Sequence, residues 1–220
     1  MPQAPRISIQ KQPDSVHIKW SDCDQTINFN HSFTNPGRFF GRTVDSNQAL
    51  LKACSNRRHS IQSVLDLTGG WGIDSFILAQ HGKQVTVIEQ NPVIYSVLSA
   101  SLGTARQYSH TQAAAQRITL KQDNSYNYLK TLGNADYDCI YLDPMFPEHR
   151  STAKPGKAMQ LLQNLTENLD IAVCFDLAPQ KAGKRVVGKR PARATTISST
   201  KPDLSHYSKT IRFDIYLTGC

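Results

Sequence analysis

The feature that most constrains this chain is a regular alternation of strand-like and helix-like segments that starts near Ser63. Four apolar stretches have the length and composition of β-strands: SVLDL, VTVIE, ITLKQ and YDCIYLD. The segments between them have helical spacing: FILAQ, VIYSVLSASLGTA and NSYNYLKTL. The alternation continues with two helix-like and two strand-like segments: KAMQLLQNL, DIAVCFDLA, KRVVGK and RFDIYL. This pattern predicts βαβ units, and therefore an α/β fold with a mainly parallel, doubly wound sheet.

The first 60 residues have a different character. Three β-prone stretches (RISIQ, SVHIKW and TINF) are broken by Pro13-Asp14 and Ser21-Asp22, which predicts a small hairpin or meander. Residues 31–42 are expected to form a loop, and Ser46 is expected to cap a helix over NQALLKAC. A chain of 220 residues suffices for one α/β domain with a modest extension. We therefore expect an N-terminal β-rich extension with a linker helix over 1–60 and the main domain over 61–220.

Composition argues against several classes of protein. No apolar run approaches the ~20 residues that a membrane span needs, and the first ten residues lack the pattern of a secretory signal. The five cysteines are odd in number and form no Cys-x-x-Cys pair, which favours reduced thiols in a cytoplasm. The seven histidines are also scattered, so no metal site is expected.

Positive charge is concentrated near the C-terminus. The formal net charge is +8, and no acidic residue lies between Asp176 and Asp203. This acid-free window holds seven basic residues: Lys181, Lys184, Arg185, Lys189, Arg190, Arg193 and Lys201. Clustered lysine and arginine indicate either a solvated basic face or a surface for nucleic-acid phosphates, and charge alone does not decide between the two.

A glycine-rich turn, DLTGGWGID, joins the first strand of the main domain to its first helix. Its glycines allow a sharp turn and a close approach of the backbone to a ligand, and Gly72 is expected to let the helix pack against the strand. Glu89 ends the next strand, where a carboxylate accepts hydrogen bonds from both hydroxyls of a ribose. Alternatively, Glu89 caps the helix that starts near Pro92.

The third strand ends in a polar stretch, Asp123-Asn124-Ser125, which offers hydrogen-bonding groups for the edge of an adenine. Asn124 or Ser125 is also expected to cap the helix that follows. The chain has no Walker lysine and no pyrophosphate-binding fingerprint. An adenosine-containing cofactor without phosphates is therefore indicated, and that description fits S-adenosylmethionine.

The fourth strand ends in Asp143-Pro-Met-Phe-Pro147, which resembles the Asp/Asn-Pro-Pro-Tyr/Phe signature of methyltransferases that act on exocyclic amino groups of nucleobases. Such an amine is a poor nucleophile because its lone pair is delocalised into the ring. Hydrogen bonds to the Asp143 carboxylate and the Pro144 carbonyl would localise that lone pair, and the prolines would hold both acceptors in place. Phe146 would stack on an extruded base. The simpler alternative is turn chemistry at Asp-Pro with Phe146 in the core.

Taken together, these motifs resemble the ribosomal small-subunit methyltransferase J family. The resemblance is carried from about Val64 onward by five motifs: Asp66-x-Thr-x-Gly-x-Gly-x-Asp74, Glu89-x-Asn-Pro92, Asp143-Pro-Met-Phe-Pro147, Lys189-Arg-Pro191 and Arg212-Phe-Asp-Ile-Tyr216. It implies a Rossmann-like class I methyltransferase that uses S-adenosylmethionine. The implied reaction is methylation of the exocyclic N2 of one guanine in small-subunit (16S) ribosomal RNA. The implied partner is that RNA or the pre-assembled small subunit.

The resemblance and the strand-end pattern together define the expected site. Cofactor contacts are expected at ten positions: Asp66, Gly70, Gly72, Ile73, Asp74, Glu89, Gln90, Asn124, Ser125 and Asp143. The expected catalytic residues are Asp143, Pro144 and Phe146. RNA contacts are expected at five basic positions: Arg150, Lys154, Lys157, Lys189 and Arg190. Family members usually carry arginine in place of Ile73 and Gln90, so backbone contacts are expected there.

Two other functions stay open at this point. One is methylation of another nucleic-acid amino group, such as a tRNA guanine or a DNA base. The other is a non-catalytic RNA-binding protein that keeps a methyltransferase-like fold. An intact Asp143 clamp together with Glu89 favours an enzyme, because a pure RNA binder needs neither.

Overall fold

The computed structural model describes residues 6–22, 25–34, 44–55, 60–145, 156–166, 171–198 and 200–218, with only the backbone described at 44–47. Helix α1 spans Val44–Ala53. The prediction that Ser46 caps this helix is wrong, because Ser46 lies inside its first turn. Most of the loop expected over 31–42 lies outside the described residues.

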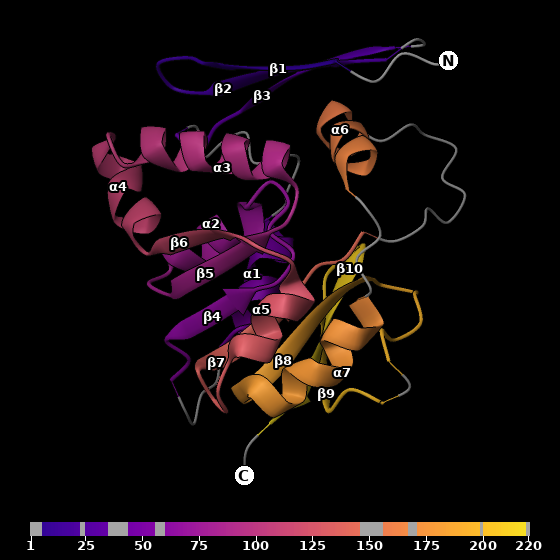
Figure 1. Cartoon of the computed structure of the whole chain (residues 1–220). Coiled ribbons are helices and arrows are strands. Elements are labelled where there is room, and N and C mark those ends of the chain that lie inside the picture. The colour runs from indigo at the N-terminus through magenta and orange to yellow at the C-terminus, as the bar shows by residue number, and fades with distance from the viewer. Residues whose placement is uncertain are drawn as a thin grey trace.

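The N-terminal residues form a separate three-stranded antiparallel sheet in the order β1-β2-β3, as a meander would. Its strands are β1 (Arg6–Lys11), β2 (Val16–Ser21) and β3 (Thr26–His31). Alternate residues of β2 are buried, and they belong to the same apolar cluster as the helices of the main domain. Figure 1 shows this sheet lying across α3, so the extension is packed onto the main domain.

The main sheet has seven strands in the order β6-β5-β4-β7-β8-β10-β9. Five strands are parallel: β4 (Ser63–Asp66), β5 (Gln84–Glu89), β6 (Ile118–Gln122), β7 (Tyr137–Leu142) and β8 (Ala182–Pro191). Strand β10 (Ile211–Leu217) runs antiparallel between β8 and β9 (Leu204–Tyr207). From β4, the first strand of the parallel set, the chain builds the sheet outward to β5 and β6 on one side and to β7 and β8 on the other. The predicted doubly wound, mainly parallel sheet is therefore confirmed.

Helices cover both faces of this sheet. Where the structure describes the chain after α1, it has six helices: α2 (Ile73–Gln80), α3 (Pro92–Ala105), α4 (Ser109–Gln116), α5 (Ser125–Thr131), α6 (Lys157–Leu165) and α7 (Ile171–Lys181). In Figure 1, α5 and α7 lie in front of the sheet, and with its front face they form one apolar cluster. Helices α1 to α4 contribute to a second cluster on the other face. Strand β7 contributes residues to both clusters, because the side chains of Tyr141 and Leu142 lie on opposite faces of the sheet.

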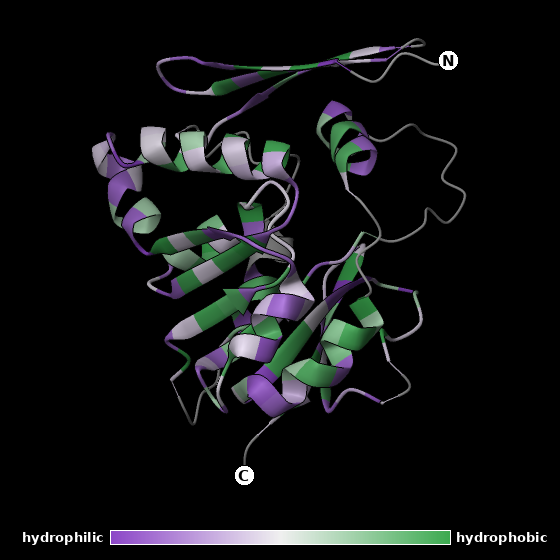
Figure 2. Ribbon diagram, in the orientation of Figure 1, coloured by the Kyte–Doolittle hydropathy of each residue, from purple (hydrophilic) through white to green (hydrophobic). Residues whose placement is uncertain are grey.

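Hydropathy follows this layering. Figure 2 shows the central strands and α7 mainly in the hydrophobic colour and much of α4 in hydrophilic or neutral shades. Within the described residues, no helix is both long and apolar enough to cross a membrane.

The glycines of the turn have different roles from those expected. A Cβ on Gly72 (φ +68°) would lie 2.8 Å from Cδ2 of Leu98 on α3 and 3.3 Å from Cζ of Phe33. A Cβ on Gly69 would lie 2.9 Å from Cγ1 of Val87 on β5. The expectation that Gly72 allows helix–strand packing is therefore wrong. Gly69 provides the close approach to a strand, and Gly72 provides the approach to α3.

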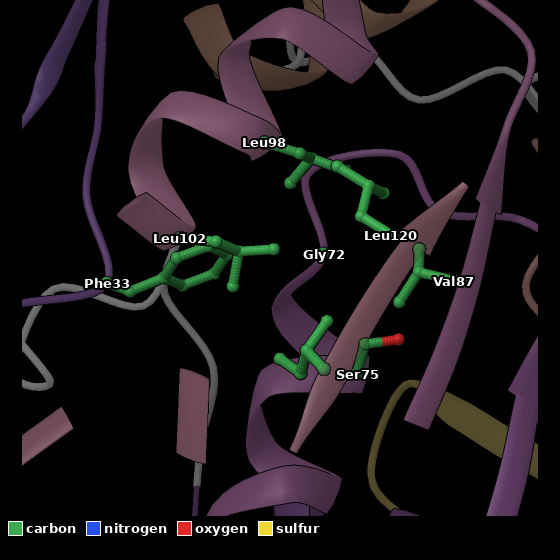
Figure 3. Close-up of a pocket in the computed structure, with 8 residues that line it drawn as sticks. Phe33, Gly72, Ser75, Val87, Leu98, Leu102 and Leu120 are labelled. Atoms are coloured by element: carbon green, nitrogen blue, oxygen red, sulfur yellow. The ribbon is translucent and has the colours of Figure 1, made fainter. Parts of the chain in front are cut away.

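A small apolar void lies beside Gly72. Figure 3 shows Leu98, Leu102 and Val87 around it, and its volume is ≈ 10 Å³. A cavity of this size holds at most one water molecule, and an apolar lining offers a water too few hydrogen-bond partners. The void is therefore a packing feature, and the ligand site must lie elsewhere.

Candidate active site

A large open cavity lies where the parallel strands β4, β5, β7 and β8 end, and residues of α6 also line it. Figure 1 shows α6 above these strand ends. The volume of the cavity is ≈ 1120 Å³, which is more than most single small-molecule ligands fill. Thirteen of the predicted site residues line it: Asp66, Gly70, Gly72, Ile73, Asp74, Glu89, Gln90, Ser125, Asp143, Pro144, Lys157, Lys189 and Arg190. The remaining ones are Asn124, which bonds to Gln90, and Phe146, Arg150 and Lys154, which lie outside the described residues. The fold therefore brings residues that are far apart in the sequence to one cavity at the strand ends, as the sequence predicted.

Asp66 shapes the glycine turn from below. Its Oδ1 accepts hydrogen bonds from the Thr68 amide (2.9 Å) and hydroxyl (3.2 Å), and its Oδ2 accepts one from the Ser75 hydroxyl (2.5 Å). The carboxyl is almost fully buried, and burial raises its pKa to about 6 against the pull of these hydrogen bonds. Asp66 therefore holds the turn in shape at the floor of the cavity.

Glu89 braces the same turn from the next strand. Its Oε2 accepts a hydrogen bond from the Gly70 amide (2.9 Å), and its Oε1 accepts one from the Asn91 amide (2.8 Å). Burial raises the pKa of Glu89, although the backbone hydrogen bonds oppose this rise. The alternative that Glu89 caps the following helix is wrong, because Asn91 is the cap of α3. A carboxylate has about four acceptor positions, so Glu89 can still receive hydroxyl donors from a ligand.

The end of β6 combines a helix cap with a lining residue. Asn124 caps α5 by accepting from the amides of Tyr126 and Asn127, both at 3.1 Å. Its side-chain amide donates to Oε1 of Gln90 (2.8 Å), so both side chains are held in place. The predicted cap is therefore confirmed at Asn124. The Ser125 hydroxyl instead donates to the Leu67 carbonyl (2.5 Å) beside the glycine turn.

Asp143 is tied directly to the glycine turn. Its backbone amide donates to the Thr68 hydroxyl (2.7 Å), which in turn donates to Asp66. The Asp143 carboxylate accepts a hydrogen bond from the Lys189 ammonium at 2.5 Å. The end of β7 is therefore held in register with the turn that the cofactor is expected to contact.

Lys189 is deeper in the site than the sequence suggested. Its ammonium lies 2.5 Å from Oδ2 of Asp143 and 3.0 Å from Oδ2 of Asp74, and the Tyr141 hydroxyl donates to that same Asp74 oxygen (2.6 Å). The charge pattern of the sequence predicted that Lys189 faces RNA. That pattern does not show which strands lie side by side, so it could not place Lys189 next to Asp143. The signal that would have found this position is the pairing of β8 with β7, in which Gly188 lies beside Leu142.

Trp71 is a lining residue that the sequence reasoning missed. Its indole N–H donates to the Ala158 carbonyl on α6 (2.9 Å), and its own carbonyl lies 2.8 Å from Nε2 of His31 on β3. The ring also packs against Phe29, with centroids 5.1 Å apart. The sequence did offer a signal for this role, because Trp71 is a large aromatic residue within a turn that otherwise consists mainly of small residues. Trp71 joins the N-terminal sheet, the glycine turn and α6.

Several basic residues of the acid-free window have intramolecular partners. Lys181 donates to the Leu132 carbonyl, and Lys184 pairs with Asp138 at 2.7 Å. Arg185 is buried and donates to the carbonyls of Ala53 and Ser55 at the end of α1. These three residues support the fold. Of the remaining basic residues in this window, Arg193 and Lys201 are exposed.

The residues present fit S-adenosylmethionine. The buried Glu89 carboxylate at a strand end suits ribose hydroxyls, and the acidic groups Asp74 and Asp143 suit a sulfonium cation. The cavity also has room for a base beside a cofactor of that size. Within the described part of the chain, no group of three or more histidine, cysteine or acidic side chains is arranged to hold a metal ion.

Comparisons with known proteins first define the class. The family model described as "Putative SAM-dependent methyltransferase" matches residues 3–218, so the fold and the site are those of an S-adenosylmethionine-dependent methyltransferase. A crystal structure of an S-adenosylmethionine-dependent methyltransferase from Neisseria gonorrhoeae superposes with a TM-score of 0.74 at 30% identity, covering 98% of this chain and 83% of that one. The match also includes the N-terminal sheet, so the expectation that the resemblance starts near Val64 is corrected.

The curated relatives then narrow the class. Ribosomal RNA small subunit methyltransferase J from Nitrosococcus oceani is 40% identical over 173 residues, which cover 78% of this chain and 68% of the relative. The protein of the same name from Francisella tularensis subsp. novicida is 32% identical over 206 residues, covering 92% and 84%. The chain therefore belongs to the ribosomal RNA small subunit methyltransferase J family.

Proposed function

We propose that this protein transfers a methyl group from S-adenosylmethionine to the exocyclic N2 of a guanine in small-subunit ribosomal RNA. The observation that carries the proposal is the position of Asp143 and Pro144 at the end of β7, where the Thr68 hydroxyl fixes them to the glycine turn. Support for the RNA class comes from the names of the relatives. A ribosomal RNA substrate would place the protein in the cytoplasm.

The role proposed for Asp143 follows from the chemistry of the amine. When bound, the cofactor supplies an electrophilic methyl group on a sulfonium. The Asp143 carboxylate and the Pro144 carbonyl accept hydrogen bonds from the amine, which directs its lone pair toward that methyl group. Positive charge grows on the nitrogen as the bond forms, so the hydrogen bond to a carboxylate strengthens in the transition state. A strong base is not needed, because the cationic nitrogen releases its proton readily afterwards.

The cofactor-binding residues are proposed from the same geometry. Glu89 would accept from the ribose hydroxyls, and the end of β6 at Asn124 and Ser125 would face the adenine. Ile73 and Gln90 would contribute mainly backbone groups, and Gly70 and Gly72 the close approach. On the RNA side we propose Lys157 and Arg190, together with Arg150, Lys154 and a stacking Phe146 from outside the described residues. We also propose residues 1–60 as the extension and residues 61–220 as the methyltransferase domain.

The test is methylation of small-subunit RNA from cells that lack this protein. Naked RNA and assembled subunits are supplied with methyl-labelled cofactor, and the modified guanines are located by mass mapping. We expect one guanine to be labelled by the wild-type protein. Label found only in tRNA or DNA would move the function to the alternative substrates, and failure to bind the cofactor in titration calorimetry would indicate a non-catalytic RNA binder.

The variant for this test is Asp143→Ala. Removing one preorganised electrostatic partner should lower single-turnover methylation by ~10²-fold or more with RNA and cofactor saturating. RNA affinity should change little, because phosphate contacts dominate it. Asp143→Asn keeps an acceptor oxygen without the charge, so its rate should be intermediate. A wild-type rate for Asp143→Ala would contradict the role given to this carboxylate.

A further inference from the structure

We infer that Lys189 is a positioning residue that holds the Asp143 carboxylate for the reaction, and that it does not contact an RNA phosphate. This inference rests on the proposed function, which it deepens. It starts from the place of Lys189 between Asp143 and Asp74, where the charge pattern of the sequence had suggested a surface lysine.

The ammonium of Lys189 lies between the two carboxylates and contacts both. Its Nζ is 2.5 Å from Oδ2 of Asp143 and 3.0 Å from Oδ2 of Asp74, both within charge-assisted hydrogen-bonding distance. The side chain of Lys189 is 13% exposed and that of Asp74 is 6% exposed, whereas that of Asp143 is 33% exposed. Turning the ammonium outward to a phosphate would leave the Asp74 charge buried without its cation, which is strongly unfavourable. Asp143, by contrast, remains accessible from the cavity.

Asp143, Asp74 and Lys189 form one local group of charges within the site. Two carboxylates and one ammonium sum to −1, which complements the single positive charge of a sulfonium and, later, of the methylated nitrogen. The contact with Lys189 fixes Oδ2 of Asp143 and so sets the orientation of the whole carboxylate. A carboxylate held in one orientation is a better acceptor for a developing charge than one that must reorient during the reaction.

Removing the Lys189 ammonium would change the protonation of the Asp143 and Asp74 carboxylates. Without it, Asp143 and Asp74 repel each other, and one of them takes up a proton at a higher pH than before. Among the described residues, the titratable or charged groups around the two carboxylates include Asp66 on β4, Cys54 after α1, Tyr141 on β7 and Arg190 on β8. Asp66 adds negative charge nearby, so it strengthens this effect. A protonated Asp143 no longer stabilises a cationic nitrogen.

The test compares Lys189→Met with Lys189→Arg. Single-turnover methylation is measured against pH with RNA and cofactor saturating. We expect Lys189→Met to be about 10- to 100-fold slower near neutral pH, a loss typical of a misplaced reacting group, and to recover partly as the pH rises. We expect Lys189→Arg, which keeps the charge, to restore much of the rate. Thermal unfolding of both variants checks that they fold.

The matched control is Arg190→Gln, the next residue on β8. We expect Arg190→Gln to reduce the slope of log RNA affinity against log salt by about one phosphate contact, and Lys189→Met to leave that slope unchanged. A reduced slope together with a wild-type pH profile for Lys189→Met would overturn the inference. So would a Lys189→Arg variant that is no faster than Lys189→Met.

A further arm separates this inference from the proposed function. If the wild-type protein methylates no small-subunit RNA, the proposed function fails, and Lys189 is then judged by cofactor binding alone. In titration calorimetry we expect the cofactor affinity of Lys189→Met to fall more steeply than that of the wild type as the pH is lowered. Identical pH profiles would overturn the role of Lys189 in setting the charge of the site.

Discussion

At the residue scale, two buried groups have pKa values displaced in opposite directions. His31 is fully buried, and burial lowers its pKa to about 4, although the hydrogen bond to the Trp71 carbonyl opposes this. Because a carbonyl only accepts, Nε2 of His31 carries the proton and Nδ1 accepts from the Ser101 hydroxyl at 2.8 Å. Asp66, on the floor of the cavity, has a pKa raised to about 6. Burial thus shifts both pKa values toward the neutral form, so that His31 is neutral at pH 7 whereas Asp66 is still ionised above about pH 6.

The sign of each contribution to stability follows from proton uptake. Between pH 4 and the ordinary His31 pKa of 6.5, the unfolded chain binds a proton that the folded protein does not, so stability is lost as the pH falls through this window. Asp66 acts in the opposite sense, because the folded protein binds the extra proton between 3.8 and about 6. The two contributions partly cancel in acid.

The prediction for His31 uses His31→Gln. Above pH 7 this variant should be less stable than the wild type by about 1–3 kcal/mol, because buried partners lose their hydrogen bonds. The gap should shrink by up to about 3 kcal/mol as the pH falls from 6.5 to 4, since only the wild type loses the His31 contribution. Urea unfolding at several pH values measures this gap. His17→Gln, on the outer face of the same sheet, is the control, and an equal pH trend in both variants would contradict the prediction.

The second residue-scale prediction concerns Glu89. Glu89→Ala should weaken S-adenosylmethionine binding by about 1–3 kcal/mol, because ligand hydroxyls and the Gly70 amide lose their acceptor. Glu89→Gln keeps one acceptor oxygen and should lose less. Titration calorimetry gives both values. Unchanged affinity in Glu89→Ala would remove this residue from the cofactor site.

At the element scale, the strands and helices that were predicted are those with strong apolar patterns. The parallel strands and α2, α3, α5, α6 and α7 appear where the sequence placed them. Helix α4 was missed because SHTQAAAQ carries few large apolar residues, and β9 was missed because it has four residues at the edge of the sheet. The site was predictable wherever a residue ends a parallel strand. Lys189 was not, because its role depends on which strand lies beside β8.

The element-scale prediction tests the contact between the glycine turn and α3. Gly72→Ala should be more destabilising than Gly82→Ala by about 1–3 kcal/mol. Both positions have positive φ, so both variants carry the same kind of backbone strain, of about 1–2 kcal/mol. Only Gly72 would bring its Cβ against Leu98, whereas a Cβ on Gly82 meets nothing within 4 Å. Denaturant unfolding measures the free energy of unfolding of both variants. Equal decreases would mean that α3 shifts to accommodate the new Cβ without loss of stability, which would contradict the prediction.

At the scale of the whole molecule, the net charge of +8 overstates the basic surface near the C-terminus. Lys181, Lys184 and Arg185 bind carbonyls or Asp138, and Lys189 lies in the site. A composition count cannot make this distinction, because it does not show which cations support the fold. Arg193 and Lys201 are the exposed members of the window that remain for phosphates, together with Arg190 in the cavity.

This gives a whole-molecule prediction with a charge-matched control. The double variant Arg193→Gln/Lys201→Gln should weaken RNA binding and reduce its salt slope by up to about two contacts. Arg6→Gln/Lys11→Gln removes the same charge from the exposed strand β1 and should have a smaller effect. Filter binding over a range of salt concentrations measures both. Equal slopes for the two double variants would show that only the net charge matters.

The strand order has a consequence for the nascent chain. Strands β4, β5 and β6 pair with one another from a continuous segment, but the second edge of β4 has no partner until β7 has been synthesised. Strand β7 then presents its own free edge until β8 emerges. Unpaired apolar edges template association between chains, and they last longer when translation is slow. Translation pauses between residues 122 and 137, or between 142 and 182, therefore prolong the exposure of an open sheet edge, and chaperone capture during synthesis would be concentrated there.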